Sequence, residues 1–459
     1  MELDMTKGKP AGLIAKFIIP IIIGNIFQQM YSMVDTIIVG RFVGVDALAA
    51  VGATGSITFL ILGFTQGLTT GFTVMTAQKF GAGDREGMRK SIGSAAVLSV
   101  IVTIVMTIVS MAGMDRLLKV MNTPANIFDM TKQYIMIICA GICCNVLYNL
   151  LASILRAIGN SVVPLVLLLI SSVTNIVLDY VLIVYGNMGV AGAAYATIIS
   201  QGLSGVLCLI YIMKCVPTLH VERRHFKLEQ QCVMNQMSVG IPMALQFSIT
   251  AIGTILVQAA LNLLGSTVVA SYSVSCKVEQ LVTQPFGAMG ATMATYCAQN
   301  RGINDLKRIQ KGVKAANIMS AIYAVLIFGV VYMILPYAVR LFITDDIEMV
   351  LGYARIYIII CGACFIPLGM IFIFRNALQG CGFGFAPMMG GVVELISRCV
   401  AAFAAARLLS YEGVCCANAG AWITAGIFLW LAYRSLMKKM LQEKQTHEER
   451  MLAEAGGAG

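Results

Sequence analysis

Charged residues are scarce in this sequence of 459 residues. Asp, Glu, Lys and Arg make up only 12% of the chain, whereas hydrophobic residues make up 58%. Soluble globular proteins carry about 25% charged and roughly 45–50% apolar residues, so this chain has too little charge to coat a soluble particle. The composition therefore excludes an ordinary cytosolic enzyme, a nucleic-acid-binding protein and a disordered chain.

Histidine is rarer still, with 3 residues, and proline is sparse, with 10. The histidines His220, His225 and His447 all lie in polar segments. A histidine-based metal site inside the apolar part is therefore not expected, and an intramembrane enzyme, which would need such a set of catalytic groups, is excluded. Glycine is abundant (44), and long apolar runs with frequent glycine are typical of transmembrane helices.

The apolar runs predict an all-α integral membrane protein. A bilayer core needs about 20 apolar residues per helix. Helices of about 25 residues each would use roughly 300 residues of the chain and leave only loops and tails. The sequence predicts twelve such helices, which begin near Leu13, Ala47, Gly93, Tyr134, Val162, Val190, Val239, Val268, Ala316, Arg355, Pro387 and Ala419.

Lysine and arginine alternate from loop to loop. They gather in the segments Lys79–Lys90, Lys214–Lys227, Arg301–Lys314 and Arg434–Arg450, and the loops between these carry few. Because basic loops stay on the cytoplasmic side, the pattern predicts a multi-pass protein of the inner (plasma) membrane with both termini in the cytoplasm.

The chain contains an internal repeat. Ala77–Asp84 matches Ala298–Asp305 at a shift of 221 residues, and Pro20 meets Pro242 at a shift of 222. We therefore predict two parallel six-helix repeats, an arrangement typical of secondary transporters with substrate sites between the halves. The predicted domains are an N-terminal lobe (1–214), a basic linker (215–235), a C-terminal lobe (236–440) and a tail (441–459).

Two aspartates lie inside the predicted membrane spans. Asp35 ends a polar stripe, Asn175 and Asp179 are one helical turn apart, and Thr197 follows in the next helix. The rise of a helix places Asp35, Asp179 and Thr197 roughly 9–12 Å below the outer surface. Oxygen ligands suit a hard cation, and two neighbouring carboxylates cannot easily both ionise, so we expect a site for H⁺ or Na⁺. The alternative is that both aspartates only bridge helices through hydrogen bonds.

Other polar residues within the spans are candidates for a substrate cavity. Glu394 and Arg398, one turn apart, are expected to pair with each other, either as a structural ion pair or beside a substrate. Pro20 interrupts a helix and is either a fixed kink or a hinge. The cavity candidates are Gln28, Ser32, Asn145, Asn149, Gln246, Thr250, Lys277, Glu279, Gln280, Arg375, Glu394 and Arg398.

Four segments, in this order, resemble the multidrug and toxic compound extrusion (MATE) family: Met33–Gly40, Ala77–Asp84, Asn175–Ile183 and Gly189–Thr197. The resemblance covers the chain apart from its tails. It implies a V-shaped pair of six-helix lobes and an antiporter that exports organic, often cationic and amphipathic compounds, driven by H⁺ or Na⁺. It also implies an ion site at Asp35, Asn175, Asp179 and Thr197, and a hinge at Pro20.

The C-terminal half departs from relatives that use acids in the seventh and eighth helices. Its seventh helix has no acid, and Glu279 lies beside Lys277. Substrates therefore need not be cations. The alternatives are a flippase for lipid-linked precursors or polysaccharides from the same superfamily, and a passive channel. We expect small organic substrates, a lipid bilayer around a monomer, and no cofactor, nucleic acid or metal apart from Na⁺.

Overall fold

The computed structural model describes residues 3–121, 123–342 and 347–456, and their regular structure is entirely helical. The first half contains α1 (Pro10–Phe42), α2 (Val45–Gly81), α3 (Arg85–Val120), α4 (Phe128–Ala140), α5 (Ile142–Ala157), α6 (Val162–Tyr180), the π-helical turn η1 (Val181–Tyr185) and α7 (Gly189–Cys215). The short helices η2 (Pro217–Leu219) and η3 (Arg223–Phe226) follow. The second half contains α8 (Gln230–Asn262), α9 (Ser266–Gly302), α10 (Leu306–Phe342), α11 (Ile347–Gly362), α12 (Phe365–Gly380), α13 (Phe385–Leu408) and α14 (Tyr411–Gly456).

The helices account for the predicted membrane spans. Within the described ranges, nine helices are long and apolar enough to cross a membrane, and the bent pairs α4–α5 and α11–α12 raise the number of spans to eleven. The remaining long helix, α9, has 37 residues but is more polar, with Lys277, Glu279 and Gln280 in its middle. It occupies the position of α2 in the repeat, so each half has six spans.

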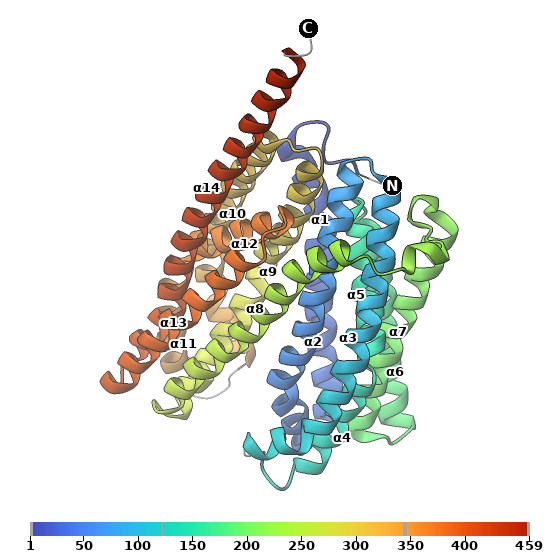
Figure 1. Cartoon of the computed structure of the whole chain (residues 1–459). Coiled ribbons are helices and arrows are strands. Elements are labelled where there is room, and N and C mark those ends of the chain that lie inside the picture. The colour runs from blue at the N-terminus through green and yellow to red at the C-terminus, as the bar shows by residue number, and fades with distance from the viewer. Residues whose placement is uncertain (1–2, 122, 343–346, 457–459) are drawn as a thin grey trace.

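The two halves form two lobes arranged as a V. The lobes α1–α7 and α8–α14 approach each other at the end that carries both chain termini, here called the closed end, and diverge toward the opposite, open end (Figure 1). Near the closed end, Gly71 of α2 meets the backbone of Gly240 of α8 so closely that a side chain would collide with it. Toward the open end, Gly52 and Gly55 of α2 have no such neighbour within 4 Å.

The repeated motif forms a reciprocal contact between the lobes. Gly81, the last residue of α2, packs against the backbone carbonyl of Gln299 in α9, and Gly302, the last residue of α9, packs against the backbone carbonyl of Gln78 in α2. A Cβ atom at either glycine would collide with the opposing carbonyl. The motif therefore requires glycine because two backbones meet there, once in each half.

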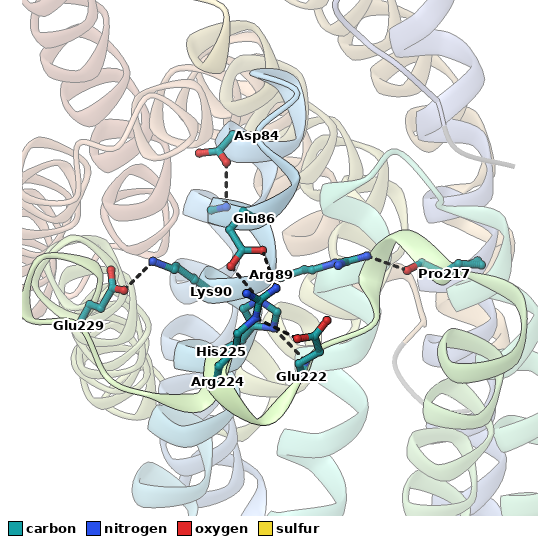
Figure 2. Close-up of polar contacts among 10 residues, drawn as sticks. Asp84, Glu86, Arg89, Lys90, Pro217, Glu222, Arg224, His225 and Glu229 are labelled. Atoms are coloured by element: carbon teal, nitrogen blue, oxygen red, sulfur yellow. Dashed lines mark hydrogen bonds and ion pairs between the residues drawn. The ribbon is translucent and has the colours of Figure 1, made fainter.

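The linker between the lobes docks onto α3 (Figure 2). His225 of η3 is 1% exposed; its Nε2 lies 3.1 Å from Glu86 Oε1, and its Nδ1 accepts a hydrogen bond from the Glu222 backbone. Lys90 of α3 pairs with Glu229 at 2.7 Å. These contacts hold the beginning of α8 beside the first lobe.

Asp84 caps α3 and supports a test of this end of the fold. Its Oδ1 accepts a hydrogen bond from the Gly87 N–H at 2.8 Å, and its Oδ2 pairs with Lys79 at 2.8 Å. Asp84→Ala should lower the free energy of unfolding by about 1 kcal/mol, the usual worth of an N-cap. Asp84→Asn can still cap the helix and should therefore retain most of this stabilisation. Equal losses in both variants would instead assign the stabilisation to the ion pair.

The same residue predicts a pH dependence. The hydrogen bond from Lys79, together with the helix cap, holds the pKa of the Asp84 carboxyl below its ordinary value. A lowered pKa in the folded state stabilises the fold above the unfolded value of about 3.9. That contribution should therefore fade as the pH falls below about 4, and an unfolding series across this range, with Asp84→Asn as the reference, measures it.

Candidate functional site

Asp35 of α1 and Asp179 of α6 lie together inside the first lobe. Their carboxyl groups lie near enough to interact electrostatically, but no hydrogen bond joins them. Asp179 is 0% exposed, and neither of its carboxyl oxygens accepts a hydrogen bond, nor does Oδ1 of Asp35. Since an ionised carboxylate only accepts hydrogen bonds, the two can bond to each other only when one carries a proton. The arrangement suits a shared proton or a cation.

Asn175 lies one turn before Asp179 on the same helix. It is 2% exposed, and neither atom of its amide has a hydrogen-bond partner. A buried amide without partners is unusual and needs an explanation. The amide oxygen is a further cation ligand, and the amide nitrogen can donate to an ionised carboxylate. The structure thus places the predicted pair on the buried side of α6.

Thr197 of α7 lies close in height to this pair. The register between the antiparallel α6 and α7 is fixed by two hydrogen bonds of 2.9 Å, from Ser171 Oγ to the Ser200 carbonyl and from Ser204 Oγ to the Leu167 carbonyl. This register sets Thr197 level with Thr174 and Asn175, about 7 Å along the helix from Asp179. Its hydroxyl donates to the Ala193 carbonyl at 3.0 Å, which leaves the oxygen available as an acceptor.

Two tyrosines near the carboxylates were not among the predicted site residues. Tyr31 of α1 and Tyr134 of α4 both lie within electrostatic range of Asp35 and Asp179. The spacing of Tyr31 and Asp35, one turn apart, could have indicated the first. Nothing in the sequence connects Tyr134 with this site, because α4 reaches it only through the folding of the lobe.

Pro20 lies where α1 changes from one lobe to the other. Before it, Phe17 and Ile18 are buried in the core of the second lobe. After it, Gly24 packs against Leu168 of α6, and the last turns of α1 join the core of the first lobe. Proline removes a backbone hydrogen bond from the helix, so α1 is easiest to bend between its two attachments.

The cavity candidates of the first lobe fall into two groups. Gln28 and Ser32 are exposed on α1, on the same helix as Asp35. Asn145 and Asn149 of α5 form a polar chain, in which Asn149 Nδ2 donates to Asn145 Oδ1 at 3.0 Å and Asn145 Nδ2 donates to Gln201 Oε1 at 3.3 Å. The second group is therefore joined to α7.

The strongest charge cluster of the second lobe is buried. Glu394 of α13 pairs with Arg398 on its own helix at 2.7 Å, as predicted, and also with Arg375 of α12 at 3.0 Å. All three side chains are less than a tenth exposed. Arg398 also donates to Asn418 of α14 at 3.2 Å. This network joins three helices inside the lobe.

The remaining candidates lie on α8 and α9. Gln246 of α8 accepts a hydrogen bond from Gln379 at 3.0 Å, and Thr250 donates to the Gln246 carbonyl. Glu279 accepts a hydrogen bond from Tyr357 of α11. Its neighbours Lys277 and Gln280 are exposed. The adjacent positions of α9 thus face both the lobe interior and its surface.

Comparison with known proteins decides the family. A model of the MatE family matches residues 20–181 and again residues 242–403. The chain belongs to the MatE family. The two matches start 222 residues apart, which is the offset of the internal repeat, and each includes the first helix of its half together with its proline. The resemblance inferred from the four sequence segments is thereby confirmed.

Relatives within the MatE family agree over most of the chain. The probable multidrug resistance protein YoeA of Bacillus subtilis is 26% identical over 77% of this chain and 78% of its own. The probable multidrug resistance protein YpnP of the same organism is 28% identical over 86% and 87%. MatE proteins are transporters, so this chain is a multi-pass membrane transporter and not an enzyme.

The fold of this MatE chain matches solved structures closely. An outward-facing multidrug resistance MATE transporter of the MOP superfamily superimposes with a TM-score of 0.89 at 21% identity, over 95% of this chain and 98% of that one. The predicted fold, two six-span repeats in a V, is confirmed. In the MatE fold Asp35 and Asp179 lie within one lobe, away from the junction between the lobes.

Proposed function

We propose that the chain is a secondary antiporter that exports amphipathic or cationic organic compounds in exchange for H⁺ or Na⁺ by alternating access. The observation that carries this proposal is the neighbouring pair Asp35 and Asp179 inside a membrane lobe: Asp179 is buried and Asp35 half-buried, and neither oxygen of Asp179 nor Oδ1 of Asp35 accepts a hydrogen bond. Ionisable groups are expensive inside a membrane and mark ion pathways. The relatives named as multidrug resistance proteins support organic substrates.

In the proposed cycle, the ion enters from the open end and neutralises the carboxylates. This removes the repulsion between Asp35 and Asp179 and allows α1 to repack against α6. The bend at Pro20 separates that movement from the part of α1 held by the second lobe. For the ion to drive transport, it must bind the two conformations with different affinity. With both termini in the cytoplasm, as the basic loops indicate, the described conformation is open to the outside.

The proposed substrate site lies between the lobes. Gln28 and Ser32 from α1, and Lys277 and Gln280 from α9, offer exposed polar groups on the two sides. The buried Arg375, Glu394 and Arg398 would not contact the substrate. They would hold the helices of the second lobe that form one side of the site. Because Lys277 accompanies Glu279, an amphipathic substrate needs no positive charge to be accepted.

Everted membrane vesicles with an acid interior test this function. We expect added ethidium or a fluoroquinolone to collapse the pH gradient in vesicles that contain the protein, and not in vesicles without it. If the collapse requires Na⁺, the coupling ion is Na⁺ and the mechanism is unchanged. If folded protein in the vesicles responds to no compound of a broad panel, with or without Na⁺, the multidrug proposal is wrong and a lipid-linked precursor becomes the better substrate.

A further inference from the structure

Residues 3–9, which we call the strap, cross the closed end ahead of α1. The strap precedes the first helix of the first lobe, yet Met5 is 0% exposed and belongs to the hydrophobic core of the second lobe. Lys7 and Lys9 on either side of Gly8 are exposed. Met5 is thus the buried residue of the strap, and the half-buried Leu3 packs against the same core.

The Met5 backbone is bound by polar side chains of the second lobe. Its N–H donates to Gln299 Oε1 at 2.9 Å. Its carbonyl accepts hydrogen bonds from Arg308 Nε at 3.2 Å, from Arg308 Nη2 at 3.0 Å and from Asn300 Nδ2 at 3.3 Å. Two N–H groups of Arg308 thus form a fork that converges on this single carbonyl oxygen.

Gln299 also connects this contact with the first lobe. The residue is 0% exposed, and its Nε2 donates to the Ala157 carbonyl at the end of α5 at 2.9 Å. The Leu3 carbonyl lies against Gly159, whose φ of +83° and close approach leave no room for a side chain. Because the Met5 N–H takes the amide oxygen of Gln299, the amide nitrogen is directed across the junction.

The two halves of the repeat differ in the contacts of this glutamine. Gln78, the counterpart of Gln299, donates to the Gly380 carbonyl at 2.9 Å in the same way. The segment before α8 docks on α3, the counterpart of α10, through His225 and Glu86, and within the described residues it makes no hydrogen bond to Gln78. The bond from the strap to Gln299 is therefore an addition to one of two equivalent contacts and is not required by the symmetry of the fold.

We propose that the strap is a lock on the closed end. It fixes Gln299 in the orientation that bonds to the first lobe, and it must loosen before the lobes separate at this end. The inference rests on the proposed alternating access, in which the closed end opens during each cycle. It adds a control on that step at a distance from the ion site.

Hydrogen–deuterium exchange of the full chain in nanodiscs tests the lock. Arg308→Ala removes the fork on the Met5 carbonyl, and Met5→Ala removes the buried anchor. The matched control is Lys307→Ala, which removes an exposed cation from the neighbouring position. In both strap variants, but not in the control, residues 78–84 and 299–305 should exchange roughly tenfold faster, while α3 residues 91–98 stay unchanged as a check of folding.

Transport gives a second readout that a merely structural role would not move. A larger population open at the closed end should lower the apparent KM for substrate offered from that side. Faster exchange of the strap itself, with unchanged exchange at 78–84 and 299–305 and unchanged KM, would overturn the proposal. If the wild-type protein exports no compound, the proposed function fails, whereas the exchange comparison still tests whether the strap holds the lobes together.

Discussion

Asp179→Asn is expected to abolish coupling between ion and substrate. Asparagine resembles a neutral carboxyl group in shape but can neither gain nor lose a proton, and it binds cations more weakly. Coupling between two ligands of a protein is commonly worth 5- to 150-fold in affinity. We therefore expect the substrate-induced collapse of an ion gradient in everted vesicles to slow by about one to two orders of magnitude, and Asp35→Asn to behave in the same way.

Asp46→Asn is the matched control for this measurement. Asp46 is an exposed carboxylate at the open end of α2, where it accepts a hydrogen bond from Asn126 at 3.3 Å. Its neutralisation changes the net charge of the protein equally but leaves Asp35 and Asp179 intact. Wild-type rates in both site variants, with normal amounts of folded protein, would show that Asp35 and Asp179 only bridge helices.

The second large effect is expected on stability, at Glu394. Glu394→Gln would remove the acid that pairs with both buried arginines, Arg375 and Arg398. Removing one partner of a buried ion pair typically costs about 3–5 kcal/mol. We expect a loss of that size in the free energy of unfolding, measured by titrating sodium dodecyl sulfate into detergent micelles that contain the protein.

Two further variants separate charge from packing. Glu412→Gln removes an exposed acid at the start of α14 and should change the free energy of unfolding by less than about 0.5 kcal/mol. The triple variant Arg375→Met, Glu394→Leu, Arg398→Met removes all three charges, and such apolar replacements are often neutral. If the triple variant were as unstable as Glu394→Gln, packing and not the unpaired charge would explain the loss.

Features that repeat along the chain could be predicted from the sequence. The spans were visible because lipid imposes long apolar runs, and the two lobes because the motif at Gln78 recurs at Gln299. The proximity of Asp35 and Asp179 could be predicted from their depth in the membrane, because the rise of a helix of known direction gives the depth of each residue. The structure places both aspartates in the first lobe, within electrostatic range of each other.

Features that depend on side-chain packing could not be predicted. The predicted single helices near Tyr134 and Arg355 are bent pairs, with angles of 46° and 47°, and neither break contains a proline. At the first break, Gly141 admits Ile198 of α7 so closely that a side chain would collide with it. Likewise Arg375 meets Glu394 from another helix, and no spacing along one helix could indicate that contact.

The reciprocal glycine contacts at the closed end resemble the interface of a two-fold symmetric dimer, although both halves belong to one polypeptide. In an isologous interface the same patch of each subunit makes the contact, so one substitution alters the interface at two places. Here Gln78 supplies the carbonyl for Gly302, while Gly81, three residues later, receives that of Gln299. An insertion between Gln78 and Gly81 would therefore displace both the carbonyl that packs against Gly302 and the glycine that packs against Gln299. The spacing in the last turn of α2 is set by the last turn of α9, more than two hundred residues away.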